Sequence, residues 1–110
     1  MPTLLPRDDD NQPIPALRLR PGGAQALAAG AASVRSAAFA PGTRVVALYA
    51  TGPVFLRSGD AAVAAGTGDH YFPAGTYYDL SLGAEKQPRH THIAALAAEA
   101  PCTLYISEKE

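Results

Sequence analysis

Two short apolar segments separated by a turn give the clearest structural signal in this chain: Arg44-Val45-Val46-Ala47-Leu48-Tyr49-Ala50, Thr51-Gly52-Pro53 and Val54-Phe55-Leu56-Arg57. The first segment is partly β-branched and apolar at every position after Arg44, which is typical of a strand buried on both faces. The Thr-Gly-Pro turn interrupts it, because proline fixes φ and glycine permits a positive φ. The pattern predicts two short strands joined by a turn.

Short apolar segments and turn residues continue to alternate up to the C-terminus. Turns rich in Gly, Pro, Asp and Ser separate the segments 61–65, 70–72, 76–82, 91–98 and 102–107. The segment 76–82 has the period of a half-buried strand, with Tyr78, Leu80 and Leu82 on one face and Tyr77, Asp79 and Ser81 on the other. In the last segment, we expect Cys102, Leu104 and Ile106 to point inward.

The part of the chain before Phe39 is harder to interpret. A short alternating stretch, 17–20, is followed by Pro21-Gly22-Gly23, which we expect to end it. The Ala-rich stretch 24–38 has helical propensity, but Gly30 interrupts it, it carries almost no charge, and no capping pattern precedes it. Two short strands, near 25–29 and 33–39, are the prediction.

These segments predict an all-β fold: an antiparallel β-sandwich or jelly-roll-like barrel of about eight short strands. No segment has the length and caps of the helix that a βαβ unit requires, so a doubly wound sheet is excluded. A chain of 110 residues is the size of one domain. We place that domain at residues 17–110.

Residues 1–16 are expected to form an extended N-terminal arm, because four prolines oppose regular structure there: Pro2, Pro6, Pro13 and Pro15. The acidic run Asp8-Asp9-Asp10 lies in the same segment. The arm could be a tail in solvent. Alternatively, it could lie on a neighbouring subunit, with Leu4, Leu5 and Ile14 as its apolar anchors.

The composition favours self-association. Twenty-three residues are Ala, against nineteen Leu, Ile and Val together, so the core has few large side chains. A domain of this size buries roughly 65% of its unfolded surface, and a core of small side chains makes the monomer marginal. Burial against copies of itself would offset that weakness.

Charge, cysteine content and the N-terminus limit the partners and the compartment. The net charge of −1 provides no electrostatic footprint for nucleic acid or an anionic membrane. The single cysteine, Cys102, cannot form an intrachain disulfide and is expected to be a small buried hydrophobe. The sequence shows neither a secretory signal nor an apolar run long enough to span a membrane, so we expect a cytoplasmic protein.

The sequence contains few candidates for catalysis. Neither a Gly-x-Ser-x-Gly elbow nor a phosphate-binding glycine loop is present. The carboxylates Asp60, Asp69, Asp79 and Glu99 are scattered singly, which favours turn or surface roles. The five tyrosines would suit either a half-wet interface or ordinary cross-strand packing. We expect no enzyme activity and no cofactor.

A histidine pair offers an alternative, metal-based function. His90 and His92 are two residues apart, so on a strand both imidazoles would point to the same face. Such a pair can bind a transition metal if a third ligand, His70 or Glu99, lies nearby. The alternative interpretation, without a metal, is a polar strand edge that faces solvent or an interface between subunits.

The segment Gly68-Asp69-His70-Tyr71-Phe72-Pro73-Ala74-Gly75 resembles the start of the second metal motif of cupins, which are small β-barrels. The chain departs from that family in three ways. Tyr78 stands where the second motif has a histidine. The first cupin metal motif contains His-x-His followed by a Glu, but here Glu99 is too far beyond His92. The two motifs also occur in the wrong order along the chain. The resemblance implies a cupin-like shape, and the alternative function is a cupin-like metal or small-molecule binding protein.

A broader resemblance covers about residues 25–108, through the stretches 42–52, 54–59, 72–75, 92–96 and 102–108. These strand-and-turn patterns resemble small proteins of tailed bacteriophages and prophages. The resemblance implies a non-enzymatic virion protein, such as a head decoration or head–tail accessory subunit, but it assigns no site residues. The implied partners are the chain itself, as a homo-oligomer with a trimer as one option, and other particle proteins. The implied location is the host cytoplasm and then the virion.

Overall fold

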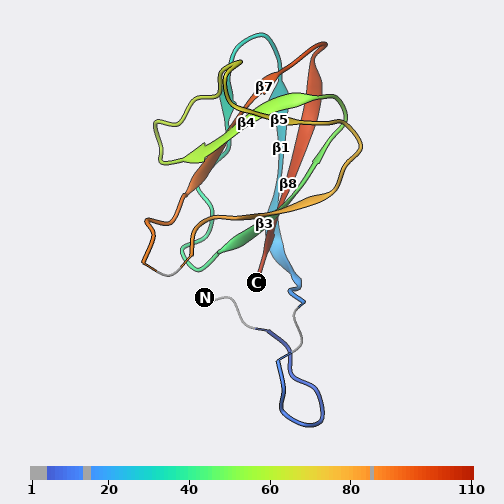
Figure 1. Cartoon of the computed structure of the whole chain (residues 1–110), viewed down its shortest axis with the longest axis vertical. Helices are drawn as coiled ribbons and strands as arrows, with labels where there is room; N and C mark the ends of the chain where they lie inside the picture. The colour runs from blue at the N-terminus through green and yellow to red at the C-terminus, as the bar shows by residue number, and fades with distance from the viewer. Residues whose placement is uncertain (1–4, 14–15, 85) are drawn as a thin grey trace.

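Two four-stranded antiparallel sheets pack face to face in the computed structural model, which describes residues 5–13, 16–84 and 86–110 (Figure 1). In chain order the strands are β1 (Leu19–Ala29), β2 (Val34–Arg35), β3 (Val45–Ala50), β4 (Val54–Gly59), β5 (His70–Phe72), β6 (Tyr78–Ser81), β7 (His92–Ala97) and β8 (Cys102–Lys109). The first sheet has the order β1-β8-β3-β6 and the second the order β2-β7-β4-β5. The predicted all-β sandwich is confirmed, and the two sheets do not close into a barrel.

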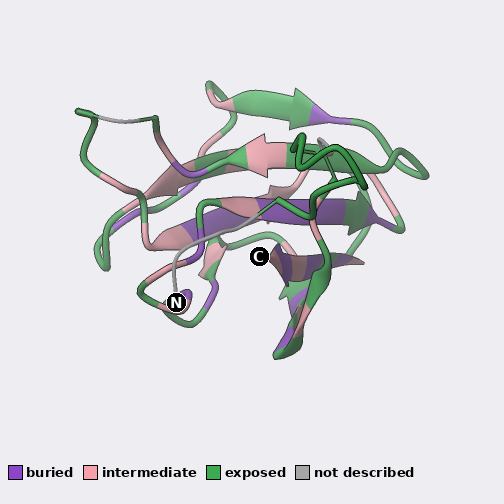
Figure 2. Ribbon diagram, turned by 90° about the horizontal axis from the view of Figure 1, so that it is seen from below, coloured by how far each residue is buried: buried purple, intermediate pink, exposed green. Residues whose placement is uncertain are grey.

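The core fills the space between the sheets. Inward positions alternate along the strands, as in Val46, Leu48 and Ala50 of β3 or Leu104 and Ile106 of β8, and all five are almost fully buried. The facing sheet contributes Val54, Ile93 and Ala95. Buried residues concentrate in the strands, whereas the connecting loops are largely exposed (Figure 2). Burial of these apolar side chains is the main favourable contribution to folding.

The predicted strand break at Pro21-Gly22-Gly23 is wrong, because β1 runs through it as a bulge. Leu19 pairs with Lys109 and Ala24 pairs with Ser107, so β1 has extra residues between these two pairs. Gly22 adopts a positive φ of 76°, and a Cβ on Gly23 would lie 2.9 Å from the Cβ of Glu108. Glycine thus lets the strand bend against β8 without ending.

The predicted strand over 33–39 is reduced to the two residues of β2. Beyond Arg35 the chain still contacts β7, but irregularly: the amide of Ser36 donates to the carbonyl of Ile93, and the amide of Ile93 donates to the Ser36 hydroxyl at 3.0 Å. The side chain of Ser36 therefore replaces a backbone acceptor. A serine that competes with the ladder in this way ends regular pairing.

The predicted segment 61–65 is a loop rather than a strand. The Asp60 carboxylate accepts a hydrogen bond from the amide of Ala62, and the amide of Ala65 donates to the hydroxyl of Ser33. Val63 and Ala65 pack on Ala94 and partly buried Leu96, which form a second small core on the outer side of β7. The loop thus covers the outer face of the second sheet.

The described part of the N-terminal segment forms a small loop that projects from the sandwich (Figure 1). An antiparallel bridge joins Arg7 to Pro13, and the Asp8 carboxylate accepts hydrogen bonds from the amides of Asp10 and Gln12 at 2.9 Å each. Leu5 is 44% exposed. The other two predicted anchors, Leu4 and Ile14, lie outside the described residues.

The two sides of the sandwich differ in how the edges of the two sheets are joined. On the β1/β2 side, which we call the closed flank, Gln25 accepts a hydrogen bond from the amide of Ala37 at 2.8 Å and donates one to its carbonyl at 3.3 Å. The carbonyl of Gly30 accepts from the amide of Ala97, which joins the β1–β2 connection to the second sheet. The opposite side, the open flank, is bounded by the short edge strands β5 and β6.

Candidate functional site

Tyrosines make up most of the large apolar side chains that are exposed in the described residues. All five are among its exposed large apolar side chains, with exposed fractions from 42% for Tyr49 to 59% for Tyr77. Tyrosine combines a large apolar ring with a polar hydroxyl, which makes it frequent at protein interfaces. These tyrosines occur at two places, the outer face of the first sheet and the open flank.

The first place is a flat apolar area on the outer side of β1, β8 and β3. Tyr49 of β3 lies directly opposite Tyr105 of β8, and Tyr105 lies opposite Ala26 of β1. The neighbouring outward positions carry alanines on β1 and β3, and Thr103 and Ser107 on β8. We call this area the tyrosine face and define it as Ala24, Ala26, Ala28, Ala47, Tyr49 and Tyr105. None of these six side chains is charged, as in an interface core, and Asp79 of β6 lies opposite Ala47 at the border of the area.

A charged cluster borders the tyrosine face. The Lys109 ammonium lies 3.0 Å from Asp79 Oδ1 and 5.3 Å from the centre of the Tyr77 ring. A hydrogen bond with Tyr77, followed by the hydrogen bond and charge of Asp79, raises the pKa of Lys109 above its ordinary value of 10.5. The cluster holds Tyr77 and Asp79 together at the β6 end of the sheet.

The second place is a groove on the open flank, between the edges of the two sheets. It has a volume of about 460 Å³. Because β5 and β6 are only three and four residues long, they do not cover the longer strands beside them. The floor contains Leu48, Leu56 and Ile93, and the rim contains Tyr71 and Tyr78. We call this feature the aromatic groove.

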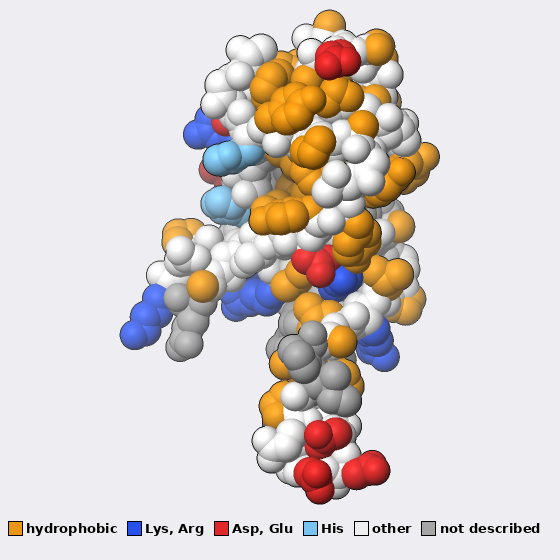
Figure 3. Space-filling view, turned by 45° about the vertical axis from the view of Figure 1, so that its right-hand side comes forward, with side chains coloured by type: hydrophobic (Ala, Val, Ile, Leu, Met, Phe, Trp, Pro, Cys, Tyr) orange, Lys and Arg blue, Asp and Glu red, His pale blue; other side chains and the backbone are white. Residues whose placement is uncertain are grey.

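Aromatic contacts fix the rim of the groove. Tyr78 packs edge-on against Phe72 with ring centres 6.3 Å apart, and Tyr71 packs edge-on against Phe55 at 5.9 Å. Edge-to-face pairs of this kind are favourable beyond the area they bury. Hydrophobic side chains gather over the body of the protein, with histidines at their border (Figure 3).

His90 and His92, the predicted histidine pair, have separate hydrogen-bond partners. His90 precedes β7, whereas His92 is the first residue of that strand. His90 Nδ1 lies 2.7 Å from the Ser58 hydroxyl, and His92 Nδ1 lies 2.7 Å from the Thr91 hydroxyl. In residues 5–13, 16–84 and 86–110, no group of three His, Cys, Asp or Glu side chains is placed to hold a metal ion. The geometry supplies neither His70 nor Glu99 as a third ligand.

Cys102 occupies the inward position that the strand pattern predicts, at the start of β8. It is half-buried and packs against the core that contains Leu104 and Ile106. Its Sγ lies 4.0 Å from the carbonyl oxygen of Pro53. These contacts are those of a packing residue.

Glu108 is a buried carboxylate that the sequence pattern did not single out. Only 5% of it is exposed, and its Oε1 accepts hydrogen bonds from the amide of Ala40 at 2.8 Å and the hydroxyl of Thr43 at 2.6 Å. Arg20 approaches its other oxygen at 4.0 Å. These contacts tie the loop before β3 to β8, so the role of Glu108 is structural.

The aromatic groove was also missed. The alternation in 76–82 correctly predicts Leu82 as buried and Leu80 as partly buried, but Tyr78 on the same face is 52% exposed. A local pattern shows which side chains share a face, but it does not show that a strand lies at the edge of its sheet. No signal in the sequence could have located this groove.

Comparison with known proteins identified no relative of this chain. No protein-family model matches the chain, and neither a curated protein nor a solved structure matches it. The fold and the surfaces define the class of this protein as an antiparallel β-sandwich with two exposed aromatic areas. None of the described residues belongs to a helix long and apolar enough to cross a membrane.

Proposed function

We propose that this protein is a non-enzymatic structural subunit of a phage or prophage particle, either a head decoration or a head–tail accessory protein. It acts by self-association and by contacts with other particle proteins. The observation that carries the proposal is the exposure of all five tyrosines, two of them side by side on the outer face of the first sheet.

Several features support a role in protein contacts. Contiguous apolar patches on a soluble protein are uncommon unless a partner covers them. The tyrosine face offers two rigid aromatic side chains beside a strip of alanines, so a partner can approach the sheet closely. The resemblance of residues 25–108 to small phage proteins points in the same direction.

The alternative interpretation of the tyrosines, ordinary cross-strand packing, accounts for only part of the arrangement. Tyr49 and Tyr105 are cross-strand neighbours and stabilise the sheet together. Even so, 42% of Tyr49 and 48% of Tyr105 remain exposed. An interface would bury that remaining area.

Self-association is tested with the full chain at micromolar concentration, by size-exclusion chromatography with light scattering. We expect the mass of a symmetric oligomer. The double variant Tyr49→Ser/Tyr105→Ser should shift the mass toward the monomer while its melting curve stays cooperative. Arg35→Ser, a change at an exposed position of β2, is the control and should leave the mass unchanged. A wild-type chain that elutes as a monomer would contradict the proposal.

The particle role needs a separate experiment. Particles from an induced host culture are purified on a density gradient and their proteins are identified by mass spectrometry. We expect the chain in the particle fraction, and we expect portal, capsid or tail genes beside its own gene. Recovery of the chain only in the soluble fraction would refute a virion role even if the chain self-associates.

A further inference from the structure

We propose that the aromatic groove binds the N-terminal arm, residues 1–16, of a second copy of this chain. This inference rests on the proposed self-association and names the surfaces that would carry it. The occupant is thus a defined segment of the same sequence, and the arms of neighbouring subunits would be exchanged.

The groove has the chemistry of a site for an apolar, proline-containing segment. Its volume of about 460 Å³ lies in the range of roughly 300–1,000 Å³ that is common for binding pockets. Its floor is aliphatic, and Tyr71, Phe72 and Tyr78 line its edges. Aromatic-lined grooves of this kind take up proline-rich segments, because such segments are already extended and lose little entropy on binding.

The arm has the matching composition. Its first six residues are Met-Pro-Thr-Leu-Leu-Pro, and Leu5 is 44% exposed. Prolines lack the amide hydrogen that strand pairing requires, so the arm is poorly suited to extend the free edge of β5 or β6. Burial of its apolar side chains between those edges is the mode of binding that remains.

Charge complementarity supports the same pairing. The arm contains three Asp and one Arg, whereas residues 17–110 contain eight Lys and Arg against seven Asp and Glu. The lining of the groove includes Arg57 and His70. The Arg57 side chain is 63% exposed and lies 3.9 Å from Asp69, so its guanidinium is only loosely held. The acidic loop of an incoming arm could pair with it.

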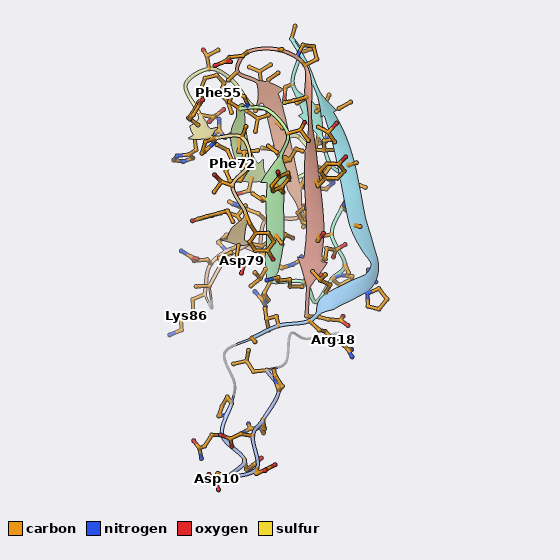
Figure 4. The ribbon with its side chains drawn as sticks, turned by 90° about the vertical axis from the view of Figure 1, so that its right-hand side faces the viewer. Asp10, Arg18, Phe55, Phe72, Asp79 and Lys86 are labelled. Carbon is orange, nitrogen blue, oxygen red and sulfur yellow. The ribbon has the colours of Figure 1, made fainter. Side chains whose placement is uncertain are left out.

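The tip of the projecting loop points away from the sandwich, which favours a groove on a neighbouring copy. Asp10 lies at the far end of the projecting loop, whereas Phe72 lies within the sandwich (Figure 4). The longest dimension of the molecule is 50 Å, about twice the other two, 28 and 24 Å. The loop is already closed by Asp8, so part of the ordering cost of binding is met before association.

The decisive experiment places a spin label on the arm of one copy and observes another copy by NMR. Asp9→Cys in a Cys102→Ala background carries the label, since Asp8 and not Asp9 accepts the hydrogen bonds of the loop. Labelled chain without ¹⁵N is mixed with unlabelled ¹⁵N chain. We expect broadening of the amides of residues 70–72 and 78–80 in the ¹⁵N copy, and recovery when the label is reduced.

Each outcome of the mixing experiment decides a different point. An oligomer by light scattering without broadening at 70–72 and 78–80, or with broadening confined to the tyrosine face, overturns the exchanged arm and leaves self-association standing. A monomer by light scattering contradicts the proposed self-association itself, and the exchanged arm with it.

A pair of matched substitutions provides a second readout. Leu5→Asp changes an exposed side chain of the arm and should weaken self-association about tenfold or more if Leu5 is an anchor. Leu19→Asp makes the same change at another leucine, 61% exposed at the start of β1, and should leave association unchanged. Equal effects of the two substitutions, or no effect of Leu5→Asp, would overturn the proposal.

Discussion

The closed flank and the open flank of the sandwich differ in how fully the two sheets contact each other. On the closed flank, an eleven-residue β1 and the side chain of Gln25 join the two layers. On the open flank, edge strands of three and four residues leave a groove of about 460 Å³ between aromatic side chains. In this sandwich, therefore, strand length at the edges and a bridging polar side chain decide which side is sealed and which keeps an open groove.

The largest expected effect comes from a pair of leucine truncations. Leu104→Ala removes a fully buried side chain between β1 and β3 and should lower the free energy of unfolding by about 3–5 kcal/mol. Leu80→Ala, at the partly buried open flank, should lower it by about 1–2 kcal/mol, because the groove is already open there. Urea unfolding of both variants measures the difference. Equal losses would mean that the open flank is packed as tightly as the core.

Removal of the buried carboxylate should have the next largest effect. Glu108→Ala leaves the amide of Ala40 and the hydroxyl of Thr43 without their acceptor, and it should destabilise the protein by about 2–3 kcal/mol. The control is Glu110→Ala, which removes an ion pair to the 76% exposed Arg18 and should cost about 0.5 kcal/mol. If the two variants have the same melting temperature, Glu108 does not hold the loop to β8.

A direct test of the closed flank is Gln25→Ala. This change deletes both hydrogen bonds to Ala37 and should cost about 1–2 kcal/mol. Hydrogen exchange at the amide of Ala37 should accelerate, while that of Ile106 in the centre of β8 should follow only the global change. Unchanged exchange at Ala37 would show that the flank is closed by other contacts.

The smallest effect concerns Lys109 at the end of the tyrosine face. Its pKa is raised in the folded protein, so its contribution to stability is fully present below pH 10.5 and is lost as the pH rises through the folded pKa. Lys109→Met should therefore cost about 0.5 kcal/mol at neutral pH, because the pair with Asp79 is partly screened by solvent. Stability curves of the two chains should converge above pH 10.5. A gap that stays constant into strong alkali would contradict the ion pair.

Sequence patterns predicted much of this fold because most of its strands are bounded by clear turn residues. The alternation in β8 correctly placed Leu104 and Ile106 in the core. The break at Pro21 was wrong because Gly22 and Gly23 allow the edge strand β1 to bulge and continue. The short apolar segment near Val63 was misjudged because a loop that covers a sheet has the same composition as a strand within one.

Sequence analysis predicted the candidate surfaces less well than the fold. The tyrosines were noted as possible interface residues, but β3 was predicted to be buried on both faces, and Tyr49 is 42% exposed. Whether a second layer covers the outer side of a strand depends on the packing of distant segments. The same reason hides the groove, whose walls come from strands of both sheets.

The loop at residues 60–69 makes the two outer sides of the sandwich unlike each other. Val63 and Ala65 cover Ala94 beneath them, whereas Tyr49 and Tyr105 on the other side stay exposed. Copies related by a single rotation axis all turn the same side in the same direction along that axis. A cyclic ring with these sides at its two ends would have chemically different ends, so each end would suit a different surface of a larger structure.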